Sequence, residues 1–344
     1  MRILVTGGAG FIRSNLIRYL LAQRQADTVV NLDLLTYAGS RERLRDLEHT
    51  VQYQFVQGDI CEPDIVRQAM RGCQTVIHFA AETHVDRSIT NATHFLRTNV
   101  EGTYVLLREA QACNVSRFVH ISTDEVYGPV LEGTVDEQAP LSPRSPYAAS
   151  KAAADLLAQA FQATYKLPTI VVRPTNIYGP AQLPEKFIPL CITNGYDRLP
   201  VPVYGDGQQR RAWLFVKDLC DALQVVIERG EAGVLYNMAG GHEQTNLDTA
   251  RAILSHLGLS ETFLQFVTDR PGHDRRYAMD DAKLRQLGWR PTMPFKQGLS
   301  ETVAWYREHA EWWRPLAQAL REDSYHWLNR PSRPSAQQPS SAVL

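Results

Sequence analysis

Short apolar runs rich in β-branched residues alternate with helix-length segments along the first half of the chain. The runs are bounded by polar residues and are predicted to be strands: Ile3–Thr6, Thr28–Asp33, Thr75–Ala80, Arg117–Ser122 and Thr169–Arg173. Helix-length segments lie between them, among them Ser14–Ala22, Ile65–Met70 and Gly102–Cys113. Continuously apolar strands that alternate with helices are typical of a parallel sheet covered on both faces. The pattern therefore predicts an α/β fold with a doubly wound parallel sheet.

After about residue 176 this alternation loosens, and Pro, Gly and aromatic residues become frequent. We therefore expect residues 1–175 to form the sheet domain that carries the chemistry. Residues 176–328 are expected to form a smaller α/β C-terminal lobe that binds substrate, with some segments returning to the sheet. Residues 329–344 are rich in Pro, Ser and Gln, a composition that cannot build a core, and are predicted to be a disordered tail.

Composition excludes several classes of partner. The 344 residues carry a net charge of −1, which offers no electrostatic attraction to nucleic acid or to an anionic membrane. No apolar run is long enough to span a bilayer and no signal segment leads the chain, so no membrane association is expected. The five cysteines are scattered without a C-x-x-C pair, which indicates a reducing cytoplasm; no metal site is expected.

The segment Gly7–Asn15, GGAGFIRSN, follows the first predicted strand and opens the first helix. Gly7 and Gly10 let backbone N–H groups approach a pyrophosphate, whose charge the helix N-terminus attracts. The glycine spacing alone is explained equally well by an ordinary glycine turn that binds nothing. Asp33, at the end of the second strand, can accept both hydroxyls of an adenosine ribose, which favours NAD over NADP in a Rossmann-type fold. Asp59 follows the third strand, where it could reach the adenine, although alone it is better explained as a turn residue.

Tyr147 and Lys151 stand four residues apart in an alanine-rich helical run, so they share one helix face. A lysine ammonium beside the phenol is expected to lower the pKa of Tyr147 towards neutrality, making it a base for an alcohol proton. Such a pair also arises by chance on solvent-facing helices. The preceding strand ends in Thr123, Asp124 and Glu125, at the sheet edge where ligands bind. Two adjacent acids there suit a general acid beside a general base; the alternative is that one caps a helix.

Six longer motifs extend these features. They are AAETHVDRSI (80–89), STDEVYG (122–128), SPYAASKAAAD (145–155), LPEKFIPL (183–190), PVYGDGQQRRAWLFVKD (202–218) and RPGHDRRYAMD (270–280). With the glycine loop, Tyr147 and Lys151, the chain resembles the extended short-chain dehydrogenase/reductases over about residues 1–328. Within that superfamily it is similar to the dTDP-glucose 4,6-dehydratases. Epimerases and decarboxylases of the superfamily share the Tyr and Lys, but usually lack the Thr-Asp-Glu triplet.

The resemblance implies NAD-dependent dehydration of dTDP-glucose to dTDP-4-keto-6-deoxyglucose, by oxidation at carbon 4, loss of water across carbons 5 and 6, and hydride return to carbon 6. It implies that Tyr147 takes the proton of the 4-hydroxyl, with Thr123 hydrogen-bonded to that oxygen and Lys151 holding the nicotinamide ribose. Glu125 then removes the proton from carbon 5. A protonated Asp124 gives its proton to the departing 6-hydroxyl.

The same resemblance implies two sets of binding residues. NAD is expected to contact Gly7, Gly10, Phe11, Ile12, Asp33, Thr36, Asp59, Ile60, Ala80, Ala81, Thr83, Tyr147 and Lys151. The nucleotide sugar is expected to contact Thr83 and Glu185 at the hexose, Asn176, Lys186 and Arg211 at the pyrophosphate, Pro202 and Tyr204 at the thymine, and Asn246, Arg270 and His273 around the nucleotide. A homodimer is implied as well, through a four-helix bundle built from the helices near Gly102–Cys113 and Tyr147–Tyr165.

Three positions depart from the pattern of the family. Arg13 replaces the third glycine of the loop, so either the helix shifts outward or the arginine turns aside, towards solvent or the pyrophosphate. We expect NAD still to bind, less tightly. Ala212 replaces an aspartate and is expected to leave Arg211 less firmly oriented. Thr83 stands where serine is usual and keeps the hydroxyl.

Two other classes of function stay open on the sequence. One is another NAD-dependent sugar-nucleotide enzyme, such as an epimerase, a decarboxylase or a different 4,6-dehydratase. The other is a non-catalytic NAD-binding regulator, which would tolerate loss of Tyr147, Lys151 or the acid pair, whereas all are present. The choice between thymine and uracil nucleotides is left undecided.

Overall fold

Seven parallel strands form the centre of the molecule. The structure is a computed structural model that describes residues 1–23 and 25–322. The strands lie in the order β10-β6-β5-β4-β1-β2-β3. Their bounds are β1 Arg2–Thr6, β2 Thr28–Asp33, β3 Tyr53–Gln57, β4 Thr75–His78, β5 Arg117–Ile121, β6 Thr169–Pro174 and β10 Leu235–Met238. All neighbours pair in parallel, so the predicted doubly wound sheet is confirmed.

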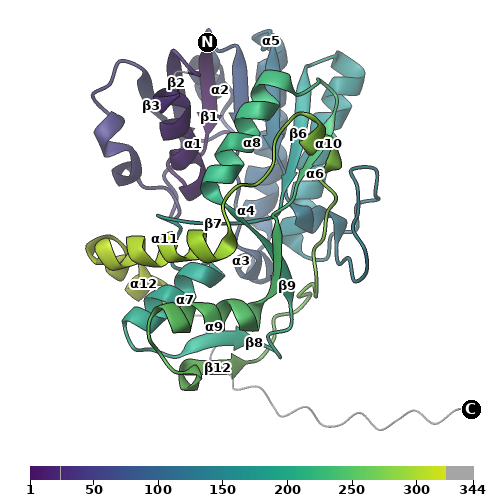
Figure 1. Cartoon of the computed structure of the whole chain (residues 1–344). Helices are drawn as coiled ribbons and strands as arrows, with labels where there is room; N and C mark the ends of the chain where they lie inside the picture. The colour runs from purple at the N-terminus through teal and green to yellow at the C-terminus, as the bar shows by residue number, and fades with distance from the viewer. Residues whose placement is uncertain (24, 323–344) are drawn as a thin grey trace, which may run out of the picture.

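Helices cover both faces of this sheet. Helices α1 (Phe11–Ala22) and α8 (Val216–Arg229) contact each other on one face, as Figure 1 shows. The other face carries α2 Pro63–Met70, α5 Gly102–Ala112 and α6 Pro146–Tyr165. Strand β1 is buried on both sides: Ile3 packs in the core under α1 and α8, and Leu4 packs in the core under α2, α5 and α6. Burial on both faces explains why the strands are continuously apolar.

A smaller lobe lies beyond the carboxyl ends of the large sheet (Figure 1). A three-stranded sheet, β11-β9-β7, and a two-stranded sheet, β12-β8, form its strands. The bounds are β7 Asn176–Tyr178, β8 Val201–Tyr204, β9 Arg210–Phe215, β11 His242–Thr245 and β12 Leu264–Val267. Helices α7 Phe187–Tyr196, α9 Asn246–His256, α11 Phe295–Glu308 and α12 Ala310–Glu322 pack with them around a separate apolar core.

The second half of the chain contributes to both parts. Helix α8 and strand β10 belong to the large sheet and its cover, and the short helix α10 (Ala282–Gln286) packs beside β10. The boundary at residue 175 stays a prediction, and the predicted tail at 329–344 lies outside the described residues. Within the described part of the chain, no helix combines the length and apolar character needed to cross a membrane.

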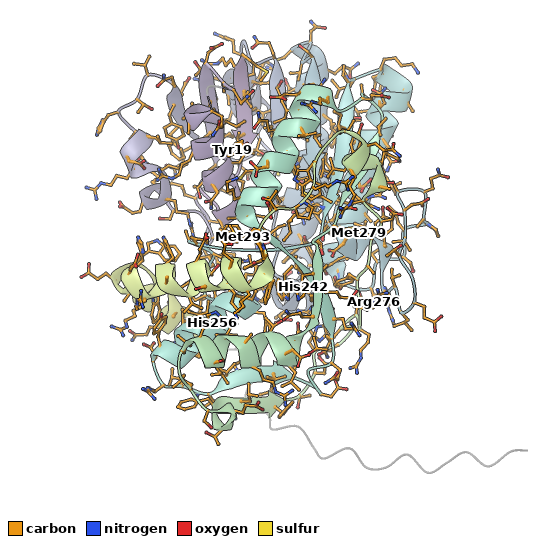
Figure 2. The ribbon with its side chains drawn as sticks, in the orientation of Figure 1. Tyr19, His242, His256, Arg276, Met279 and Met293 are labelled. Carbon is orange, nitrogen blue, oxygen red and sulfur yellow. The ribbon has the colours of Figure 1, made fainter. Side chains whose placement is uncertain are left out.

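One segment links the lobe to the large sheet. It runs through Arg276 and Met279, both labelled in Figure 2, and forms isolated bridges from Arg210 to Arg276 and from Val135 to Met279. Arg276 also pairs with Glu243 of β11. The segment is therefore bridged at one end to β9 of the lobe and at the other to Val135, in the loop that follows β5 and the acid pair.

Candidate active site

The glycine loop joins β1 to α1 at the carboxyl edge of the large sheet. Gly7 has a φ of +72°, and a Cβ built there would lie 3.0 Å from the Cα of Ala80. The backbone N–H of Gly10 donates to the carbonyl of Gly7 at 3.1 Å, which closes the turn before the helix. The positive φ and the close approach to Ala80 explain why glycine is needed at position 7.

Asp33 ends β2 beside this loop and is buried. Its carboxylate accepts hydrogen bonds from the backbone N–H groups of Ala9 at 2.8 Å and Leu35 at 2.7 Å. The two bonds fix the carboxylate at the mouth of a cleft. Eight of the residues expected to bind NAD line that cleft: Gly7, Gly10, Asp33, Thr36, Asp59, Ile60, Ala80 and Ala81. Phe11 and Ile12 begin α1 next to it.

Arg13 points into the cleft. Its Nη2 donates to the carbonyl oxygen of Phe79 at 2.6 Å, and its Nη1 lies within contact of the place that a Cβ on Gly10 would occupy. Helix α1 packs against the sheet, with Leu16 fully buried in the core. Of the outcomes expected for Arg13, a side chain in solvent is wrong: the guanidinium turns inward, and burial lowers its pKa. An outward shift of the helix stays a prediction.

The residues that line the cleft suit a dinucleotide, but the Arg13 side chain occupies part of the space. A glycine turn, a helix N-terminus and the buried carboxylate of Asp33 are the parts that hold NAD in doubly wound sheets. The missing Cβ of the second glycine is what lets a pyrophosphate approach, and the Arg13 guanidinium stands there. The remaining space measures about 60 Å³, far below the few hundred Å³ of a typical cofactor site. The Arg13 side chain therefore occupies part of the space that a pyrophosphate would take beside Gly10.

Tyr147 and Lys151 come from the first turns of α6. Ser145 caps this helix by accepting from the N–H of Ala148, and Pro146 occupies its first turn. The Nζ of Lys151 donates to the carbonyl oxygen of Ile121 at 2.6 Å, so α6 is tied to the carboxyl end of β5. Burial, followed by the charge of Arg13, lowers the pKa of Lys151 to about 7.

The expected lowering of the Tyr147 pKa by Lys151 is wrong for this structure. Burial, followed by the charge of Glu125, raises the pKa of Tyr147 above its usual value. The groups that oppose this rise are Thr123, by a hydrogen bond, and Arg13, by its charge. The physical reason is the burial of the phenol beside the acid pair, while the Nζ of Lys151 donates to a backbone carbonyl at the end of β5.

The acid pair follows β5 directly. Asp124 is 3% exposed, and burial followed by the charge of Glu125 raises its pKa to about 7. Burial also raises the pKa of Glu125, against the charges of Arg270, Arg211 and Lys186. Glu125 lines the large cavity described next, whereas Asp124 lies behind it. One acid held near its protonated form beside a second acid agrees with the expectation for a general acid and a general base.

A cavity of about 450 Å³ lies between the lobe and the large sheet. All ten residues expected to bind the nucleotide sugar line it: Thr83, Asn176, Glu185, Lys186, Pro202, Tyr204, Arg211, Asn246, Arg270 and His273. Thr83 lines this cavity and not the dinucleotide cleft. Buried polar atoms without a partner in the described part of the chain include Oδ1 of Asn176, Oδ1 of Asn246 and Nε of Arg270. Such orphaned groups are a sign of a polar ligand.

Asp86 holds one wall of this cavity and was missed in the sequence. Its carboxylate accepts from the hydroxyl of Tyr204 at 3.0 Å and from Arg270 at 3.3 Å. The ring of Tyr204 meets the ring of His273 edge-on, and burial lowers the pKa of His273 to about 4. The only signal in the sequence was the place of Asp86 inside the motif 80–89.

The comparisons with known proteins agree with this geometry. The family model described as GDP-mannose 4,6 dehydratase matches residues 4–302. A dTDP-glucose 4,6-dehydratase of Streptomyces niveus is 51% identical over 321 residues, which cover 92% of this chain and 96% of that protein.

The chain belongs to the dTDP-glucose 4,6-dehydratase family. Among solved structures, DesIV, the dTDP-glucose 4,6-dehydratase of Streptomyces venezuelae with NAD and TYD bound, has a TM-score of 0.90 and 47% identity, covering 92% of this chain and all of that one. A UDP-glucose 4-epimerase of Thermus thermophilus in complex with NAD has a TM-score of 0.83 and 31% identity, covering 90% of this chain and all of that one. Likeness to the dehydratase is therefore greater than likeness to this epimerase.

Arg211 is well held, although alanine stands at position 212 where the family has an aspartate. Its Nη2 donates to the carbonyl of Asp274 at 3.0 Å and its Nη1 to the carbonyl of Arg210 at 2.7 Å. The guanidinium also stacks over the Tyr277 ring, 4.4 Å from its centroid. Backbone carbonyls and an aromatic face therefore hold Arg211, and the expectation that Ala212 leaves it less firmly oriented stays a prediction.

Proposed function

We propose that the protein converts dTDP-glucose to dTDP-4-keto-6-deoxyglucose and water, with NAD as a cofactor that is regenerated in each cycle. The observation that carries the proposal is the buried pair Asp124 and Glu125 at the end of β5, behind and within the substrate cavity. An epimerase that uses Tyr147 and Lys151 has no need of two acids at this place. A binding protein would have no need of either pair.

The cleft residues would hold the cofactor as follows. Asp33 would accept from the adenosine ribose, and the loop from Gly7 to Gly10 would meet the pyrophosphate. Lys151, whose Nζ already reaches the end of β5, would donate to the nicotinamide ribose. NAD supplies, when bound, the hydride acceptor for carbon 4 of the sugar and the hydride donor for carbon 6.

Tyr147 would take the proton of the 4-hydroxyl, with Thr123 donating to the phenolate. The opposing effects of Thr123 and Arg13 on the Tyr147 pKa support this pairing. The resulting 4-ketone acidifies the proton on carbon 5, which Glu125 would remove. Asp124 would give its proton to the 6-hydroxyl, so that the carbon–oxygen bond breaks and water leaves. Glu125 would return a proton to carbon 5 as the hydride goes back to carbon 6. The proton gained by Tyr147 and the proton lost by Asp124 would then be exchanged through solvent, which restores both residues and balances the reaction.

The cavity residues would bind the nucleotide. Lys186, Arg211 and Arg270 bring three cations to one cavity, which suits a diphosphate through charge-assisted hydrogen bonds. Tyr204, held by Asp86, would stack on the base. Thr83 and Glu185 would lie at the hexose, because Lys186 donates to the carbonyl of Thr83 at 3.1 Å and so draws these segments together.

Incubation with dTDP-glucose tests the proposal. The expected result is the alkaline absorbance of a 4-keto-6-deoxy sugar nucleotide, without net formation of NADH. Formation of dTDP-galactose would support an epimerase, and NAD binding without any turnover would support a regulator; either result would overturn the proposal. A parallel incubation with UDP-glucose measures the preference for the base.

We further propose a cytoplasmic homodimer. The five cysteines are all free thiols, as in reducing compartments. Helices α5 and α6 pack together and present Tyr104, Leu156 and Tyr165, each 44–55% exposed, on the surface. Apolar residues gathered on two adjacent helices are typical of a surface that a partner covers, and a two-fold axis would make a four-helix bundle of them.

A further inference from the structure

Thr175 lies immediately after β6, behind the acid pair, and is 5% exposed. Its backbone N–H donates to the carbonyl of Met238 in β10 at 3.0 Å, which fixes the residue in the sheet. The hydroxyl oxygen lies between two other oxygens. Oδ2 of Asp124 is 3.1 Å away, and the carbonyl oxygen of Ala212 in β9 is 3.0 Å away.

The number of hydrogens decides how these three oxygens are joined. A threonine hydroxyl has a single hydrogen to donate, and a backbone carbonyl can only accept. Both contacts are hydrogen bonds at the same time only if Thr175 donates to Ala212 and the carboxyl group of Asp124 donates to Thr175. That arrangement requires a proton on Asp124. An ionised Asp124 would have to draw the hydroxyl hydrogen away from Ala212.

The groups on the other sides of Asp124 have opposite effects on its pKa. Glu125, from the same turn, disfavours a second negative charge on Asp124. Arg211 of β9 favours one, and so would a hydrogen bond donated to Asp124 by Thr123 or Thr175. Thr123 has its hydroxyl 3.1 Å from Oδ1 of Asp124, but the same hydroxyl hydrogen-bonds Tyr147 of α6. The phenol of Tyr277 also faces Asp124. A Thr123 hydrogen that serves the Tyr147 oxygen is not available to Asp124.

We propose that Thr175 is a positioning residue that keeps the catalytic proton on Asp124, because its hydrogen is committed to the Ala212 carbonyl and it offers Asp124 only a lone pair. The role in catalysis rests on the proposed dehydration. The arrangement of the protons does not, since it is argued from the contacts of Thr175 with Asp124 and Ala212. Thr175 touches no substrate-cavity surface and acts through Asp124.

The pH dependence of water loss tests the direction of this effect. Loss of water needs protonated Asp124, so its rate falls as the pH rises through the Asp124 pKa. Thr175→Val keeps the shape of the side chain and removes the oxygen that accepts from Asp124. The pH at which the rate of water loss falls is expected to be about one unit lower in this variant. On the alkaline side of that fall, bound NADH should decay up to about tenfold more slowly. Thr175→Ser restores the hydroxyl and is expected to match the native enzyme. The proposal would be overturned if the fall in the rate of water loss stayed at the same pH in Thr175→Val. It would also be overturned by a shift to higher pH, which is expected if Thr175 donates its hydrogen to an ionised Asp124.

Infrared difference spectra separate this proposal from the proposed function. A protonated carboxyl group has a C=O stretching band that can be recorded without substrate. The band that is lost in Asp124→Asn reports the proton on Asp124 directly. We expect this band in the native protein at neutral pH, and we expect it to titrate at lower pH in Thr175→Val. Absence of the band from the native protein below pH 6 would overturn the proposal even if Thr175→Val fails to fold. A protein that shows the band and its shift but does not dehydrate dTDP-glucose would refute the proposed function alone.

Discussion

The guanidinium of Arg13 donates a hydrogen bond to the carbonyl oxygen of Phe79, across the cleft where a dinucleotide would enter. The bond joins the first turn of α1 to the end of β4, and it places a cation against Gly10. The charge of Arg13 contributes to the lowered pKa of Lys151 and opposes the rise in the pKa of Tyr147. One substitution in the glycine loop therefore reaches both the cofactor cleft and the catalytic pair.

Replacing Arg13 by glycine is expected to tighten NAD binding about tenfold or more. The native chain must break a charged hydrogen bond before NAD enters, and a bond of that kind is worth roughly 1.5–3 kcal/mol. Calorimetric titration of NAD⁺ into stripped native and variant proteins measures the difference. Arg18→Gly is the matched control, because it removes an arginine from the outer side of the same helix, where Arg18 pairs with Asp46. Equal affinity of the native protein and Arg13→Gly would show that the cation does not obstruct the cofactor.

Replacing Asp124 by asparagine is expected to leave oxidation at carbon 4 intact and to slow loss of water by about 10²-fold or more, the usual contribution of a positioned general acid. NADH should then accumulate on the enzyme in single-turnover absorbance measurements. Lys217→Gln, in an exposed ion pair with Asp221, serves as a control and should behave as the native protein. An unchanged rate of water loss would remove Asp124 from the role.

The same variant has a consequence for stability. The folded-state pKa of Asp124 is raised to about 7, so the native protein binds an extra proton relative to the unfolded chain between about pH 4 and 7. Its stability therefore falls as pH rises through that window, and Asp124→Asn escapes the loss. The variant's advantage should grow from near zero at pH 4 to at most about 4 kcal/mol at pH 8. Urea unfolding at both values measures it, and a constant difference would contradict the buried-acid assignment; Asp64→Asn, at an exposed position, is the control.

The proposed dimer depends on the apolar surface of α5 and α6. Leu156 is 55% exposed on α6, and Leu156→Glu would place a charge inside the interface, where an unpaired charge is strongly unfavourable. Light scattering at micromolar concentration should give a dimer mass for the native protein and a monomer mass for the variant. Leu131→Glu changes a 67% exposed leucine in a loop and should stay dimeric. A monomeric native protein would refute the dimer.

The sequence by itself determined the parts that depend on local pattern. Continuous apolar strands between helices specify a parallel sheet covered on both faces, because only such strands bury every side chain. The carboxyl ends of parallel strands share one edge, so the glycine loop, Asp33 and the acids after β5 had to meet there. The four-residue spacing of Tyr147 and Lys151 likewise sets them on one helix face.

Only the tertiary structure decided how distant segments meet. Thr175, Asp124 and Ala212 lie on separate strands or turns, and nothing in their local sequence indicates that three oxygens converge. Strand β10 joins β6 because the second half of the chain supplies the last apolar strand for the sheet edge. The direction of Arg13 was open for the same physical reason: a long flexible side chain takes its rotamer from the nearest available acceptor, and that acceptor, the Phe79 carbonyl, belongs to another strand's end.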